Sequence, residues 1–139
     1  WKLNDSATRA YLGRALAIFN NNELVVADRR NKRFNIYSLT GELLRSVRCD
    51  EIDTDGVTLC HAGGDSIIVS HLFASHELFK FNLDTGAVEW RSYAVKRPTA
   101  VMMLNKEYMY VLVTEWALSN QVKFFIVNQM TGEVKLDVL

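Results

Sequence analysis

The sequence is poor in cysteine and contains no long apolar run. Cys49 and Cys60 are the two cysteines, and no C-x-x-C pair accompanies the three histidines. Two cysteines form no disulfide framework, so we expect a reducing compartment, the cytoplasm. A zinc site needs a fuller set of ligands, and we predict no metal and no cofactor. The apolar runs are too short to span a bilayer, so we also predict no membrane partner.

Charge of one sign and catalytic motifs are lacking too. Lys plus Arg and Asp plus Glu each number 16, which gives a formal net charge of +0. A basic surface for nucleic acid would therefore have to be local. The sequence contains no G-x-S-x-G elbow, Walker loop or dinucleotide fingerprint. We predict from these absences that the protein is not an enzyme.

What the sequence does contain is a repeat. The dipeptide Thr-Gly occurs at Thr40-Gly41, Thr85-Gly86 and Thr131-Gly132, at spacings of 45 and 46 residues. Each dipeptide lies between two short segments in which apolar residues alternate or run continuously, and two similar segments come before them. Such segments are typical of strands rather than helices. Each unit is therefore predicted to be four short strands, with a glycine turn between the third and the fourth.

Four antiparallel strands in a unit of roughly 40–50 residues indicate a blade of a β-propeller. We predict an all-β β-propeller of three four-stranded antiparallel blades. A sandwich or barrel is the alternative, but three aligned turns favour blades. The single proline, Pro98, is expected between two units, where no ladder hydrogen bond is needed. The predicted divisions of this one domain are an N-terminal segment or edge strand (1–13), blade 1 (14–49), blade 2 (50–94) and blade 3 (95–139).

Three blades alone make an open arc, because propellers generally close with four to eight. We expect one of two solutions. The chain is a fragment of a longer protein, which the missing initial Met suggests. Alternatively, two copies form a head-to-tail homodimer that completes a six-bladed ring.

Part of the first unit carries a more specific signal. The segment NELVVADRRNKRFNIYSLTGELLRSV, residues 22–47, has a strand ending in Val-Ala-Asp and then a hairpin with Asn31 and Arg33. An aromatic strand and a glycine turn follow. This pattern resembles an NHL repeat, with Lys32 in place of the family's central histidine. The second and third units keep only the strand rhythm and the turn. The resemblance implies a propeller of the kind found in tripartite-motif proteins, which bind proteins or RNA.

One face of the predicted propeller is the best candidate for binding. It carries the loops between the second and third strands and the connections between blades, here called the loop face. Its sharpest feature is the run from Arg29 to Arg33, with four cations in five residues. This run is either a patch for phosphate or acidic groups, or a solvated hairpin in which Arg33 pairs with Asp28. The candidate partner-binding residues of the loop face are Arg29, Arg30, Lys32, Arg33, Phe73, His76, Lys96, Arg97 and Trp116.

These observations favour a non-enzymatic interaction module that binds a protein partner through its loop face. Binding of single-stranded RNA through an NHL-type basic face is the alternative. A metal-dependent hydrolase of the lactonase type is a third possibility, because Glu115 could face a central channel. No matching set of carboxylates recurs in the other units. Trp90 is expected to pack between two blades rather than to bind a partner.

Overall fold

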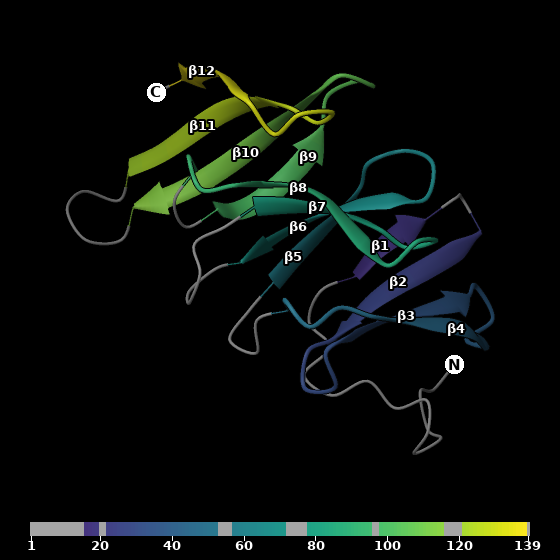
Figure 1. Ribbon diagram of the computed structural model, residues 1–139. Helices are drawn as coiled ribbons and strands as arrows, with labels where there is room; N and C mark the ends of the chain where they lie inside the picture. The colour runs from purple at the N-terminus through teal and green to yellow at the C-terminus, as the bar shows by residue number, and fades with distance from the viewer. Residues whose placement is uncertain are drawn as a thin grey trace.

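The chain folds into three separate sheets of four strands each. The computed structural model describes residues 16–19, 22–52, 57–71, 78–95, 98–115 and 121–138 (Figure 1). Every sheet pairs its strands in sequence order, and all the pairs are antiparallel. The described residues contain strands and turns but no helix. The predicted all-β architecture of three four-stranded blades is therefore confirmed.

The strands of each blade are short and follow one another along the chain. Blade 1 contains β1 (Leu16–Phe19), β2 (Glu23–Asp28), β3 (Arg33–Ser38) and β4 (Leu43–Arg48). Blade 2 contains β5 (Val57–His61), β6 (Ser66–His71), β7 (Leu78–Asn82) and β8 (Ala87–Ser92). Blade 3 contains β9 (Pro98–Met103), β10 (Tyr108–Glu115), β11 (Gln121–Asn128) and β12 (Val134–Val138). Figure 1 shows the three sheets in a stack, with blade 2 between blade 1 and blade 3.

The predicted glycine turns join the third and fourth strands of every blade. Gly41, Gly86 and Gly132 have φ angles of 89°, 71° and 77°, a left-handed conformation that costs little only for glycine. A side-chain oxygen at the end of each third strand holds the turn. Asn82 Oδ1 accepts the backbone N–H groups of residues 84 and 85, and Asn128 Oδ1 accepts those of residues 130 and 131. In blade 1, Ser38 Oγ accepts the backbone N–H groups of residues 40 and 42.

The core of the protein lies between the blades. Side chains alternate along each strand, so a blade has a front face toward the following blade and a back face toward the preceding one. The front of blade 1 and the back of blade 2 form one apolar cluster, in which the rings of Phe34 and Phe81 lie 5.4 Å apart between centroids. The front of blade 2 and the back of blade 3 form the second cluster. Each blade is thus stabilised by its neighbours rather than by a core of its own.

The position of Pro98 differs from the prediction. It is the first residue of β9 and lies opposite Val113, next to a register shift between Leu112 and Val113. The sequence predicts it in a connection between units. A proline lacks the N–H of a regular ladder, but it is tolerated at the first residue of a strand and at a bulge. Pro98 thus occupies a strand position that tolerates proline, but the strand begins at Pro98 and not after it.

Candidate functional site

The hairpin between β2 and β3, residues 29–32, is built around a buried carboxylate. Asp28 is 0% exposed at the end of β2. Its carboxylate accepts hydrogen bonds from Asn31 Nδ2, at 3.0 and 3.2 Å. It also pairs with Arg33, whose Nε lies 2.8 Å from Asp28 Oδ2. The expected ion pair between Arg33 and Asp28 is confirmed, and a charge-assisted bond of this kind fixes the base of the hairpin.

Lys32 ties the same hairpin to the connection between blades 1 and 2. Its Nζ donates a hydrogen bond to the backbone carbonyl of Ile52. Its own carbonyl accepts a hydrogen bond of 2.8 Å from the N–H of Cys49. The φ angle of Lys32 is 54°, a left-handed conformation that a residue with a side chain adopts at some cost. The hairpin is therefore held in one conformation by contacts at both sides.

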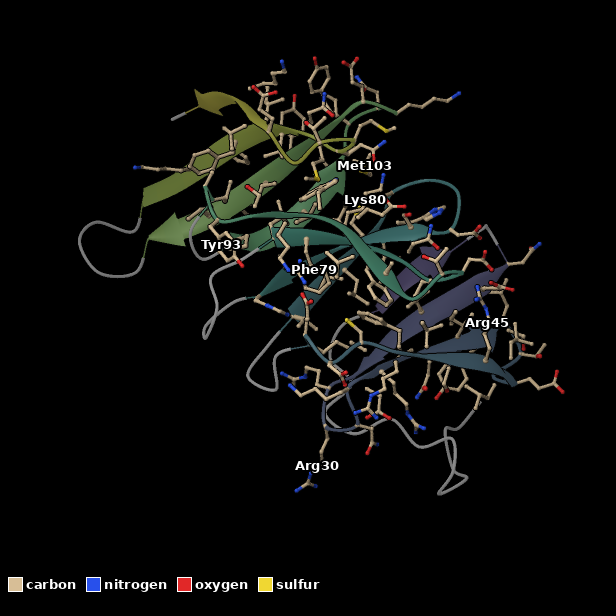
Figure 2. All side chains as sticks on the ribbon, in the orientation of Figure 1. Arg30, Arg45, Phe79, Lys80, Tyr93 and Met103 are labelled. Carbon is tan, nitrogen blue, oxygen red and sulfur yellow. The ribbon has the colours of Figure 1, made fainter. Side chains whose placement is uncertain are left out.

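The four cations of the hairpin have different surroundings. Arg29 is 4% exposed and belongs to the protein interior. Arg33 and Lys32 are engaged with Asp28 and Ile52 as described. Arg30 is exposed and extends away from the body of the protein in Figure 2. The run that looked like one basic patch in the sequence thus presents mainly Arg30 to a partner.

The connection after β4 carries acidic residues close to the hairpin. Asp50 pairs with Arg48, at 2.7 Å between Oδ1 and Nε. Glu51 pairs with Arg91 of β8, at 3.0 Å between Oε2 and Nε. These side chains line a groove of about 340 Å³ between the outer strands of blades 1 and 2. Both acids already have arginine partners, so the groove is close to neutral.

The other predicted binding residues are not covered by the structure. Phe73, His76, Lys96, Arg97 and Trp116 lie outside the described residues. The side chain of Glu115 is also outside the described part. The described parts of the loop face are therefore the blade 1 hairpin, the connection 49–52 and residues 93–95, which begin the connection between blades 2 and 3.

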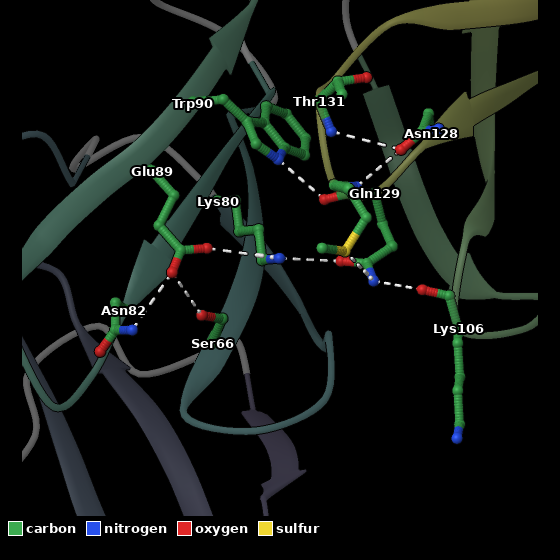
Figure 3. A network of polar contacts seen from close by, with 10 residues as sticks. Ser66, Lys80, Asn82, Glu89, Trp90, Lys106, Asn128, Gln129 and Thr131 are labelled. Atoms are coloured by element: carbon green, nitrogen blue, oxygen red, sulfur yellow. Dashed lines mark hydrogen bonds and ion pairs between the residues drawn. The ribbon is translucent and has the colours of Figure 1, made fainter.

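Sequence reasoning missed a polar network between blades 2 and 3 (Figure 3). Lys80 is 7% exposed, and its Nζ lies 2.9 Å from Gln129 Oε1 and 3.3 Å from Glu89 Oε2. Trp90 Nε1 donates a hydrogen bond of 2.8 Å to the carbonyl of Gln129, so the expected packing of Trp90 between blades is confirmed. In the sequence, the single lysine within the apolar segment LFKFNL indicates such a network, because a buried cation needs a partner.

Burial raises the pKa of both thiols but does not decide the pKa of Glu89. It raises the pKa of Cys49 to about 11 and also raises the pKa of Cys60. Burial by itself would raise the pKa of Glu89 too. The hydrogen bond from Asn82 and the charge and hydrogen bond of Lys80 together outweigh it, so that the pKa of Glu89 is lowered. Glu89 is therefore an ionised partner of Lys80 rather than a proton donor.

The described residues hold no group of three or more His, Cys, Asp or Glu side chains arranged to bind a metal ion. Within the same ranges, none of the elements is a helix that is long and apolar enough to cross a membrane. Cys49 and Cys60 are both free thiols.

The comparisons with known proteins bear on the fold. The chain is similar to hydrazine synthase of Kuenenia stuttgartiensis, with a TM-score of 0.69 and 9% identity over 91% of this chain and 36% of that one. It is similar to the WD40 β-propeller domain of Doa1, with a TM-score of 0.64 and 14% identity over 87% of this chain and 38% of that one. BamB from Moraxella catarrhalis matches with a TM-score of 0.58 and 17% identity over 88% of this chain and 36% of that one.

These similarities show a β-propeller fold, and the chain spans little more than a third of each of the three proteins. No protein-family model matches the chain, and no curated protein does. The likeness to propellers is therefore general and does not single out the NHL type.

Proposed function

We propose that the protein is a non-enzymatic β-propeller module that binds a protein partner through its loop face. The observation that carries the proposal is the double anchoring of the blade 1 hairpin. Asp28 holds it from within, and Ile52 and Cys49 hold it from the neighbouring connection. A loop that is fixed before binding loses little conformational entropy when a partner arrives. The exposed guanidinium of Arg30 suits an acidic group on that partner.

The distribution of charge favours a protein over RNA. Strong binding to a phosphate backbone rests on several cations that contact phosphates together. In the hairpin, Arg29 is buried, while Lys32 and Arg33 are engaged with the protein's own groups. Among the described residues of the hairpin, Arg30 is the cation whose side chain is exposed, and a single exposed guanidinium suits a local contact with a carboxylate. Binding of single-stranded RNA is therefore an outcome of the test rather than the proposal.

The remaining parts of the proposal concern location and assembly. Two free cysteines, one of them buried, are compatible with the reducing cytoplasm, where we place the protein. The absence of catalytic motifs in the sequence supports a binding role over an enzymatic one. The NHL type of the repeat and a homodimer that completes a six-bladed ring stay predictions.

Fluorescence anisotropy with two labelled probes tests the proposal. One probe is a poly-glutamate peptide and the other a single-stranded RNA of mixed sequence, each measured at low and at moderate salt. We expect the peptide to bind and Arg30→Ala to weaken its binding severalfold, by roughly 0.5–1 kcal/mol. Lys106→Ala is the matched control, because Lys106 is an exposed cation in the turn between β9 and β10, on the opposite face.

Two results would contradict the proposal. Equal effects of Arg30→Ala and Lys106→Ala would mean that the hairpin does not select the acidic probe. Tighter binding of RNA than of peptide, with an affinity that falls steeply with salt, would favour the nucleic-acid function.

A further inference from the structure

A groove between blades 2 and 3 opens on the face opposite the loop face. This face is formed by the turns that join the first strand to the second and the third strand to the fourth, and is here called the turn face. The groove has a volume of about 610 Å³, and its lining comes from three such turns and the adjoining strand ends. In Figure 2 Met103, which lines the groove, lies far from Arg30 of the loop-face hairpin. The groove is therefore separate from the loop face.

Two methionines of blade 3 and two glycines of blade 2 give the groove its shape. Met130 is 62% exposed, and Met103 packs partly buried against the apolar cluster between the two blades. A methyl group added at Gly63 or Gly64 would meet no atom within 4 Å, so the space beside these glycines is open. Methionine side chains are flexible and adapt to the shape of an apolar group. The groove therefore suits an apolar side chain of a partner.

The fold itself does not require a methionine at position 130. Asn128 Oδ1 accepts the N–H groups of residues 130 and 131, and Asn82 Oδ1 accepts those of residues 84 and 85. Met130 and Asp84 thus occupy equivalent positions in two turns of the same kind. In blade 2 the position holds an exposed polar residue, as is usual in a turn. Met130 adds apolar surface to the groove without being part of the buried core.

The groove lies within an acidic surface. The described residues of the turn-face turns include one lysine, Lys106, and the following acids: Glu42, Asp65, Asp84, Glu107 and Glu133. Asp65 and Glu107 directly follow residues that line the groove. Glu133 lies near Lys135, at 3.9 Å, but within the described part of the chain Asp65 and Glu107 form no ion pair. The turn face is therefore acidic, although the chain as a whole has a formal net charge of +0.

We propose that this groove binds a basic segment of a partner protein. One apolar side chain of the segment enters the groove, and neighbouring lysine or arginine side chains lie beside Asp65 and Glu107. Charge complementarity selects this occupant, because an acidic segment would meet like charges on the turn face. Lys106 is the one like charge that a basic segment meets in the groove, so its removal should strengthen binding. The two surfaces are separate and of different charge, so this inference does not rest on the proposed function.

Fluorescence anisotropy with two labelled peptides and the full chain tests the apolar part of the site. One peptide is poly-lysine with a single central leucine, and the other has alanine in place of the leucine. We expect the leucine peptide to bind at least about threefold more tightly, and Met130→Ser to weaken its binding by about the same factor, because each change removes apolar contact. Met102→Ser is the matched control and should leave binding unchanged. Met102 is also 62% exposed, but it precedes Met103 in β9 and so lies on the other face of the strand.

The same peptides test the charge of the site. Glu107→Gln should weaken the binding of both peptides about twofold or more, and the loss should shrink as the salt concentration rises. Lys106→Ala should strengthen the binding of both. Glu42→Gln is the control for this series, because Glu42 is an exposed acid of the turn face that belongs to blade 1 and does not line the groove.

Circular dichroism and thermal melting check that the variants fold, since all of them replace exposed residues. Equal binding of the leucine and alanine peptides would overturn the inference, because charge alone would then attract them. So would equal effects of Met130→Ser and Met102→Ser. Sedimentation velocity provides a further check: self-association of the chain that Met130→Ser abolishes would make a second copy the occupant and would overturn the choice of a basic partner segment.

Discussion

Replacing Gly132 with alanine should destabilise the protein much more than the same change at Gly86. Both glycines lie in the turn between the third and fourth strands, with φ angles of 77° and 71°. A left-handed conformation costs an alanine about 1 kcal/mol at either position. The two sites differ in what the added methyl group would meet. At Gly86 the nearest atom is Val47 Cγ1 at 4.0 Å, which is ordinary contact.

At Gly132 the methyl group would collide with an indole ring. Its position lies 2.5 Å from Trp90 Cε3 and 2.9 Å from Trp90 Cδ2. The ring would have to move, although it is packed between blades and bonded to the carbonyl of Gln129 at 2.8 Å. Overpacking of this kind costs about 1–3 kcal/mol. Together with the backbone strain, Gly132→Ala should lower the free energy of unfolding by about 2–4 kcal/mol.

Urea denaturation followed by circular dichroism measures both variants on one scale. A double-mutant cycle with Trp90→Ala gives the physical cause. Without the indole, Gly132→Ala should cost no more than the strain of about 1 kcal/mol seen for Gly86→Ala. Equal costs for Gly132→Ala and Gly86→Ala in the presence of Trp90 would refute the packing that we assign to the boundary between blades 2 and 3.

Three further predictions concern the ion pairs and the thiols. Arg33→Ala should lower the free energy of unfolding by about 2 kcal/mol, because it removes a partner of the buried Asp28, whereas Arg30→Ala should change it by less than about 0.5 kcal/mol. The pKa of Glu89 is lowered, so its ionised form stabilises the fold above the ordinary pKa of 4.5, and this stability is lost as the pH falls through the lowered pKa. Thermal melting at a series of pH values should therefore show a melting temperature that depends less on pH for Glu89→Gln than for the wild type. Cys49, with a pKa of about 11, should react with a disulfide reagent at neutral pH only after urea unfolds the chain, and rapid labelling of the native protein at Cys49 would contradict its burial.

Local features of the fold were accessible from the sequence. The glycine turns and the pair between Asp28 and Arg33 join residues that are close along the chain, so spacing and charge were sufficient to predict them. Long-range contacts were not accessible in this way. Lys80 and Gln129 are 49 positions apart, and no pattern in either segment specifies the other. Lys32 likewise bonds to Ile52, which is 20 positions further along the chain in the connection after β4.

Which residues of a third strand share a face depends on the hydrogen bond that closes the turn after that strand. The N–H of Gly41 bonds to the carbonyl of Ser38, three residues back. The N–H of Gly86 bonds to Asn82, and that of Gly132 to Asn128, four residues back in each case. Aligning the units on Thr-Gly therefore shifts blade 1 by one residue, and a shift of one residue exchanges the two faces of a strand. Which side chains of the third strands face the following blade could be assigned only from the hydrogen bonds of the turns.

The three blades stack in order, front to back, as one unit. Proton NMR tests this most directly through nuclear Overhauser effects across the two boundaries. We expect an effect between the ring protons of Phe34 in blade 1 and Phe81 in blade 2, whose centroids are 5.4 Å apart. We also expect one between the indole N–H proton of Trp90 and the turn that contains Gln129 in blade 3. Assigned, folded protein that shows neither effect would contradict the stacked arrangement.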